Sequence, residues 1–200
     1  MPIIHVLKLF ANAREAWSEI HAKRYSTAAC LAGHTIPFAL IPAVAGYVGT
    51  SMVGWQVAGG EVIRLTPASA GQISVLYFFA MIVAVGSVGW MIHWMGRTYG
   101  ADQPLSQCIV LASFTATPLF VVGAVQAYPI LWLNLVVGLP ALAFTTYIFY
   151  TGVPVMMEIP PERGFLFSSA VLAFGLVALV AMLAVTVLLW GGGFGPTFTA

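Results

Sequence analysis

Charged residues are scarce in this sequence of 200 residues, where Asp, Glu, Lys and Arg together make up 6%. A soluble domain carries about a quarter charged residues, so this chain cannot cover a water-facing surface. With 60% hydrophobic residues and a mean hydropathy of +0.97, its main solvent is the lipid bilayer. Only helices or closed barrels satisfy the backbone there, and the long apolar runs lack the period-two alternation of barrel strands. The sequence therefore predicts an all-α polytopic membrane protein.

Charge is also absent from the interior of every long apolar run. Buried charges mark proton relays and ion pathways in membrane proteins, so their absence argues against a proton-coupled carrier or a charged selectivity ring. It also removes paired carboxylates for acid–base catalysis, and neither a GxSxG nor an HExxH motif occurs. We therefore expect no enzyme, no catalytic residue and no cofactor. The net charge of +1 leaves no basic patch for nucleic acid.

Five apolar segments are long enough to cross a bilayer, for which a helix needs about 20 residues. They cover residues 27–53, 70–95, 105–125, 130–150 and 167–190. Only residues 126–129 (QAYP) separate the third from the fourth, which predicts a tight helical hairpin with Pro129 in the first turn of the fourth. The predicted organisation is a segment 1–25, a five-span domain 26–191 and a flexible external tail 192–200.

Basic residues orient the predicted spans, because Lys and Arg concentrate in cytoplasmic loops. One side collects Lys8, Arg14, Lys23, Arg24, Arg97 and Arg163, and the other side has only Arg64. This distribution predicts a cytoplasmic N-terminus and an external C-terminus. Residues 158–164 (EIPPERG) then form a cytoplasmic connector, whose prolines end the fourth span and stiffen the turn.

The N-terminal segment shows the spacing of an amphipathic helix. Its apolar stripe consists of Ile3, Leu7, Phe10, Ala13, Trp17 and Ile20. Two placements are open. The helix can lie along the cytoplasmic membrane surface with Trp17 at headgroup depth, or it can pack on the cytoplasmic loops.

Inside the spans, small and polar residues favour close helix packing, because they let backbones approach and bond across helices. The candidates are Gly46, Gly49, Gly86, Gly89, Ala112, Ala116 and Thr117. Four prolines within the spans predict kinks, namely Pro37, Pro42, Pro118 and Pro140. Trp90, Trp94, Trp132 and Trp190 fall near the predicted interfaces and are typical of aromatic belt anchors.

Two cysteines and two histidines lie at similar depth near the cytoplasmic ends of the first three spans. They are Cys30, His34, His93 and Cys108. Cys and His are ligands of zinc, copper and haem. Shared depth does not give a shared direction, and each residue can equally be a lone packing residue. We therefore expect no metal, with these four as the residues to check.

Three stretches resemble the bacterial Yip family. Residues 14–20 (REAWSEI) resemble its short cytoplasmic opening. Residues 97–123 (RTYGADQPLSQCIVLASFTATPLFVVG) resemble its central motif. Residues 147–164 (YIFYTGVPVMMEIPPERG) resemble the segment that closes the fourth span. The matching family-motif positions are Tyr99, Gly100, Ser106, Thr117, Pro118, Leu119, Tyr150 and Gly152.

Within the family the likeness is greatest to the small YohC-type inner-membrane proteins. The resemblance implies five spans, a cytoplasmic N-terminus and a place in a bacterial inner membrane, but little chemistry. Eukaryotic members are linked to vesicle traffic and to Rab-type GTPases, and they carry long cytosolic N-terminal regions. This chain has only about 25 residues there.

The leading hypothesis is a non-enzymatic protein that organises membrane lipids or partner proteins, a homo-oligomer included. Its predicted docking surface is formed by Trp17, Arg97, Tyr99, Glu158 and Arg163. One alternative is a small carrier or channel for an uncharged or lipidic solute, because broken helices mark binding sites in some transporters. Another is a metal or redox accessory protein that uses the Cys and His residues.

Overall fold

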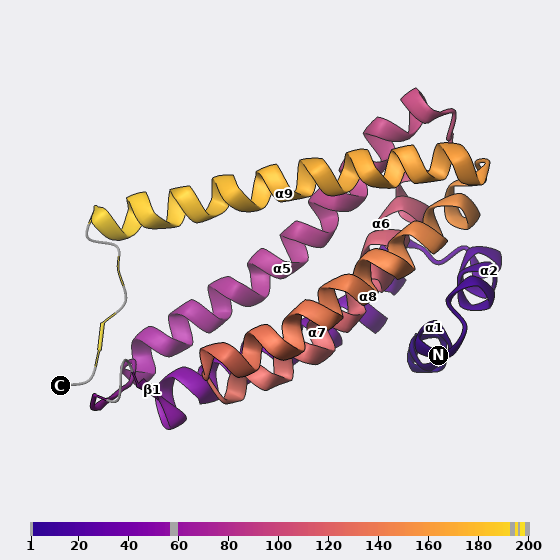
Figure 1. Cartoon of the computed structure of the whole chain (residues 1–200). Coiled ribbons are helices and arrows are strands. Elements are labelled where there is room, and N and C mark those ends of the chain that lie inside the picture. The colour runs from indigo at the N-terminus through magenta and orange to yellow at the C-terminus, as the bar shows by residue number, and fades with distance from the viewer. Residues whose placement is uncertain (1, 57–59, 193–194, 196, 199–200) are drawn as a thin grey trace.

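The chain forms a bundle of long helices, with two short helices packed against one end (Figure 1). The computed structural model describes residues 2–56, 60–192, 195, 197 and 198, with only the backbone described at 2–4, 178, 179, 181, 182, 185 and 189. The long helices are α5 (Pro67–Gly96), α8 (Leu131–Met157) and α9 (Pro161–Gly191), and shorter helical pieces make up two further spans.

Four of the five predicted spans are confirmed as helical segments long and apolar enough to cross a membrane. They are Thr27–Val53, Pro67–Tyr99, Leu105–Ala127 and Leu131–Met157. The predicted fifth span falls within α9, which packs against α8 and α5. Because α9 has 31 residues and an α-helix rises 1.5 Å per residue, it extends over about 46 Å.

The N-terminal segment contains two helices where one was predicted, α1 (Pro2–Ala11) and α2 (Ala13–Lys23). Asn12 divides them, because its side-chain oxygen accepts a hydrogen bond from the Glu15 backbone N–H at 3.4 Å and so caps α2. Asn-x-x-Glu is a readable helix-start signal. A new helix axis begins at Asn12, so the predicted stripe does not continue from one helix to the next.

The predicted apolar stripe holds in α2 and fails in α1. Trp17 and Ile20 are fully buried in α2, as predicted. In α1 the buried apolar residues are Val6 and Leu9, whereas Leu7 of the predicted stripe is 68% exposed.

The first span is an irregular helix with a π-helical turn at each end. It consists of α3 (Thr27–Cys30), the π turn η1 (Leu31–Thr35), α4 (Ile36–Val48) and the π turn η2 (Gly49–Val53). Such π turns are rare and often occur at functional sites. Here the first of them places two polar residues, His34 and Thr35, in the interior with 1% and 0% exposure.

The third span is broken where Pro118 was expected to kink it. It consists of α6 (Leu105–Thr115), α7 (Thr117–Val122) and the 3₁₀ turn η4 (Gly123–Ala127). Pro118 has no N–H to give to the Phe114 carbonyl one turn earlier. The Thr117 hydroxyl donates to that carbonyl instead, at 2.7 Å, so the break leaves no orphaned acceptor there.

Two predicted turn boundaries were wrong. The fourth span continues to Met157, and Glu158 ends it in a left-handed conformation at φ 54°. Only residues 158–160 connect the helices, because α9 already begins at Pro161, where a missing N–H costs nothing. At the other end, Pro129 precedes the first residue of α8 and does not lie in its first turn.

A short hairpin closes the opposite end of the bundle. Strands β1 (Trp55–Gln56) and β2 (Val62–Ile63) pair antiparallel, with Trp55 opposite Ile63. Thr197, in the predicted tail, bonds to Thr66 through both backbone and hydroxyl. Most of residues 192–200, where a flexible tail was predicted, lie outside the described residues.

Candidate functional site

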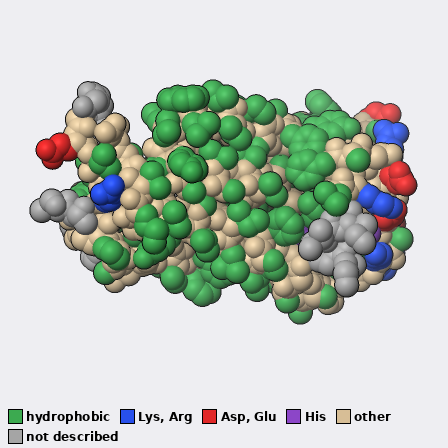
Figure 2. Space-filling model, turned by 90° about the horizontal axis from the view of Figure 1, so that it is seen from below, with side chains coloured by type: hydrophobic (Ala, Val, Ile, Leu, Met, Phe, Trp, Pro, Cys, Tyr) green, Lys and Arg blue, Asp and Glu red, His purple; other side chains and the backbone are tan. Residues whose placement is uncertain are grey.

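Charged side chains gather at one end of the molecule, which we call the charged end (Figure 2). It is built from α1, α2, residues 97–103 after α5, and residues 158–164 around the α8–α9 turn. Together with Arg24, which follows α2, these segments carry six basic and five acidic side chains, and the opposite end has only Glu61 and Arg64. The charged end is the part of the chain where a water-soluble partner or a lipid headgroup can make polar contacts.

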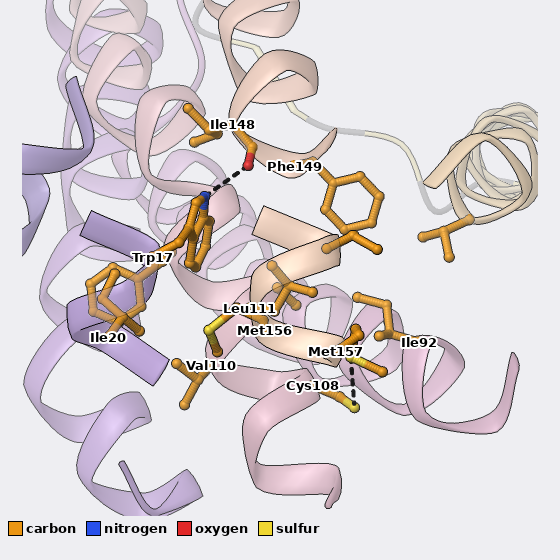
Figure 3. Close-up of a cluster of buried hydrophobic side chains, with 14 of the residues drawn as sticks. Trp17, Ile20, Ile92, Cys108, Val110, Leu111, Ile148, Phe149, Met156 and Met157 are labelled. Carbon is orange, nitrogen blue, oxygen red and sulfur yellow. Dashed lines mark hydrogen bonds between the residues drawn. The ribbon is translucent and has the colours of Figure 1, made fainter. Parts of the chain in front are cut away.

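Trp17 anchors α2 to this end of the bundle (Figure 3). Its indole N–H donates to the Ile148 carbonyl of α8 at 2.9 Å, and its ring meets Phe114 edge to face. The close approach requires glycine at position 152, because a Cβ there would stand 2.5 Å from Trp17 Cε2. Trp17 and Gly152 therefore fit as knob and hole, which fixes α2 against α8.

Glu158 links the α8–α9 turn to the end of α2. Its carboxylate lies 2.8 Å from His21 Nε2 and 3.9 Å from Arg24 Nη2. Arg24 and Glu158 are also the two non-glycine residues with positive φ in the described part of the chain. Left-handed backbone is unfavourable for such residues, and it persists here at the point where two helix ends meet.

The loop after α5 is joined to the same turn. Tyr99 closes the 3₁₀ turn η3 (Arg97–Tyr99), and its ring stacks on Phe167 of α9 with centroids 5.0 Å apart. Gly100 adopts φ 78°, and the Arg163 guanidinium lies 3.0 Å from the position its Cβ would occupy. A side chain at position 100 would thus meet both backbone strain and the Arg163 side chain.

The structure places the five residues of the predicted docking surface at the charged end, but it buries one of them. Arg97, Glu158 and Arg163 are exposed at the charged end, and Tyr99 is partly buried against α9. Trp17 was predicted to face a lipid or partner, and it is 0% exposed. Its wide apolar ring is more stable between α2, α6 and α8 than at a water interface. Sequence spacing missed His21 and Arg24, whose partner Glu158 lies over 130 residues away.

A polar clamp that the sequence did not indicate joins α1 to α2. His5 is buried, with Nε2 at 2.7 Å from Lys23 Nζ and Nδ1 at 3.4 Å from Glu19 Oε2. Lys8 donates to the same Glu19 carboxylate. Because a lysine ammonium only donates, His5 accepts at Nε2 and is neutral in this arrangement.

We expect the contact between α1 and α2 to weaken in acid. Burial and then the Lys23 charge lower the pKa of His5 below its ordinary 6.5, with Glu19 opposing this in part. Neutral His5 therefore stabilises the contact between α1 and α2 fully above pH 6.5. This stabilisation is lost as the pH falls through the lowered pKa that His5 has in the folded protein. Hydrogen exchange across residues 2–23, corrected for intrinsic rates, should be faster at pH 5 than at pH 7.5. The non-titrating variant His5→Gln should lack this step, and equal protection of wild type at both pH values would contradict the prediction.

The four predicted metal candidates do not form a site. Among the described residues, no group of three or more His, Cys, Asp or Glu side chains can hold a metal ion. His93 bonds to the Gln103 carbonyl at 3.0 Å, and Cys108 lies against Met157, with the two sulfurs 4.0 Å apart (Figure 3). Cys30 and Cys108 are buried free thiols. His93 and Cys108 both approach the Gln103 carbonyl, but similar depth along the helices did not bring the four side chains together as one ligand set.

His34, the fourth candidate, belongs to a buried polar contact between the first and third spans. The Thr117 hydroxyl gives its proton to Phe114 O, so its oxygen accepts from His34 Nε2 at 2.9 Å. The Nδ1 atom of His34 then carries no proton, and it has no hydrogen-bond partner in the described part of the chain. Beside this pair, Thr35 donates to Ser113 at 3.0 Å.

Comparison with known proteins places the chain in a family. The Yip1 domain matches residues 7–182. The chain belongs to the Yip1-domain family. It is 35% identical over 190 residues to "Inner membrane protein YohC" of Escherichia coli K12, covering 95% of this chain and 97% of that protein, and it matches the same protein of Escherichia coli O6:H1 strain CFT073 equally well. No solved structure matches the chain.

Family membership confirms the resemblance inferred from the three stretches, and the structure gives several of the predicted motif positions a physical role. Gly100 allows the left-handed turn, and Gly152 leaves room for the Trp17 ring. Thr117 and Pro118 form the break in the third span. Tyr150 bonds to Ser169 of α9 at 2.8 Å. These predicted motif positions thus hold the helices and the charged end together.

Proposed function

We propose that this Yip1-domain protein is a non-enzymatic, multi-pass protein of the bacterial inner membrane that organises partner proteins or lipids through its charged end. One observation supports this most directly. Three segments distant in sequence meet there through Trp17, through Glu158 and through Arg163 over Gly100. Such a preorganised polar surface suits recognition, because less ordering is required on binding.

The proposed topology has five spans, with α9 as the fifth and the charged end in the cytoplasm. Six of the seven basic residues belong to the charged end, in agreement with the positive-inside rule. The name of the relative from Escherichia coli K12 supports an inner-membrane location. The nearly balanced charges favour a protein partner over anionic lipid, which selects clusters of basic residues.

Charge reversal at the charged end should release the partner. In protein freed from its own membrane with gentle detergent, native mass spectrometry should show a stoichiometric extra mass, which identifies a partner protein, a lipid or a second copy. We expect Arg97→Glu/Arg163→Glu to reduce the occupied fraction at least tenfold. The matched control is Glu61→Lys at the opposite end, which should keep the mass. A bare wild-type protein, or equal occupancy in the double variant, would refute the proposal.

The second candidate is a small carrier for an uncharged or lipidic solute. The observation that favours it is the contact between two irregular spans, where the π turn holding His34 meets the break at Thr117. Broken helices that face each other at membrane depth form solute sites in some transporters. Proteoliposomes should then move a solute or lipid faster than protein-free vesicles, and His34→Ala should abolish the difference. Equal rates with and without protein would end this candidate.

A further inference from the structure

A cavity of about 530 Å³ lies between α5, α6, α7, α8 and α9, away from the charged end. Its walls are mostly apolar, with Val85, Phe120 and Phe149 among them, and none of the described residues that line it is charged. Leu142 and Leu176 belong to its lining and are 52% and 63% exposed. Since both lie inside membrane-spanning helices, the cavity opens sideways to hydrocarbon.

Two hydroxyl groups in this apolar lining have no partner. Thr115 of α6 and Thr145 of α8 both line the cavity. Their Oγ1 atoms are buried, and neither has a hydrogen-bond partner among the described residues. Thr145 is only 8% exposed. Threonine in a helix commonly bonds to the carbonyl one turn earlier, as the neighbouring Thr146 does with Leu142 O at 2.9 Å.

Both hydroxyls lie near the middle of their spans. At 1.5 Å per residue, Thr115 is about 15 Å from the start of α6, and Thr145 is about 18 Å from the end of α8. The hydrocarbon core is about 30 Å thick, so the headgroups and ester carbonyls of phospholipids lie at its edges. A phospholipid would bring only its chains to this depth, and the two hydroxyls would stay unpaired.

We propose that the cavity binds an uncharged quinone-type lipid, a ring with two carbonyls on a hydrocarbon chain. Each carbonyl accepts a hydrogen bond from Thr115 or Thr145 once rotation about χ1 turns the hydroxyl into the cavity. The chain leaves past Leu142 and Leu176 into the bilayer. The volume falls within the range of about 300–1,000 Å³ typical of small-molecule pockets. This binding site is independent of the function proposed for the charged end.

Binding of a decyl-substituted benzoquinone to the purified full-length protein tests the hydroxyls. Native mass spectrometry should show one bound probe in wild type, with an affinity at least tenfold lower in the isosteric variant Thr115→Val/Thr145→Val. The matched control Thr146→Val, whose hydroxyl bonds to its own helix, should bind like wild type. The proposal is overturned by no one-to-one binding in wild type, by equal affinity in the double valine variant, or by equal binding of a decyl chain without the ring.

A second pair of variants tests the cavity itself. Gly175 lines it and Gly138 does not, and a Cβ at either position would meet no atom within 4 Å. Gly175→Leu should fill the space and abolish binding, while Gly138→Leu should bind the probe normally. Equal binding by both variants would place the probe elsewhere and overturn the proposal. Arg97→Glu/Arg163→Glu should also bind the probe normally, which separates this test from that of the charged end.

Discussion

Replacing Trp17 with alanine should lower the free energy of unfolding by about 3 to 5 kcal/mol, the usual cost of removing a large buried aromatic side chain. The indole is 0% exposed, and its N–H bonds to Ile148 O. Alanine would leave a void over Gly152 and remove the hydrogen bond from the indole to the Ile148 carbonyl. Thermal unfolding in detergent measures the loss, and limited trypsin digestion should cut faster at Arg14 and Lys23 as α2 separates from α8.

Trp90→Ala is the matched control for this prediction. Trp90 is 59% exposed and stacks on Trp94, with ring centroids 6.4 Å apart. Its removal should change the unfolding free energy by only about 0.5 kcal/mol, as expected for a surface position. Similar losses in both tryptophan variants would mean that Trp17 does not anchor α2, and the preorganised charged end would lose its main support.

Replacing Gly89 with alanine should destabilise the protein by about 1 to 3 kcal/mol, the usual cost of overpacking. Gly89 lies where α5 crosses α6, and an added Cβ would stand 2.8 Å from Ile109 Cα and 2.7 Å from Ile109 Cγ1. Backbone cannot rotate out of the way as a side chain can, so the two helices must separate. The melting temperature in detergent reports the change.

Gly86, one turn earlier on the same helix, provides a control for which alanine should have no destabilising effect. A Cβ there would meet nothing within 4 Å. Because glycine within a helix is less favourable than alanine by roughly 0.5–1 kcal/mol, Gly86→Ala should be neutral or slightly stabilising. If both variants shifted the melting temperature in the same direction by the same amount, close packing at Gly89 would not be the cause.

These four residues show what one sequence could and could not predict. Gly86 and Gly89 have the same residue type, the same span and the same predicted packing role. Trp90 was predicted to lie at a membrane interface, and the same position was one of the two placements left open for Trp17. The structure separates each pair, because burial depends on the direction in which a side chain points from its helix and on what lies opposite. The local spacing of residues in the sequence gives neither this direction nor the opposing residue.

The sequence by itself determined the solvent, the helical class, the positions of four of the five predicted spans and the family. These properties follow from composition and from runs of about 20 apolar residues, which act locally. Local reasoning also placed the break at Pro118, and the family resemblance pointed to Gly100 and Gly152, although neither gave the reason why each glycine is needed. The charge count likewise predicted which segments share one end of the molecule.

Only the tertiary structure decided which side chains meet. It placed Trp17 over Gly152, Glu158 beside His21, and the unpaired hydroxyls of Thr115 and Thr145 along one cavity. It also kept the four candidate metal ligands from converging on one site. The physical reason is that a hydrophobic span fixes the depth of a residue in the membrane, while the rotation and crossing of the helices, set by packing over the whole bundle, fix its neighbours.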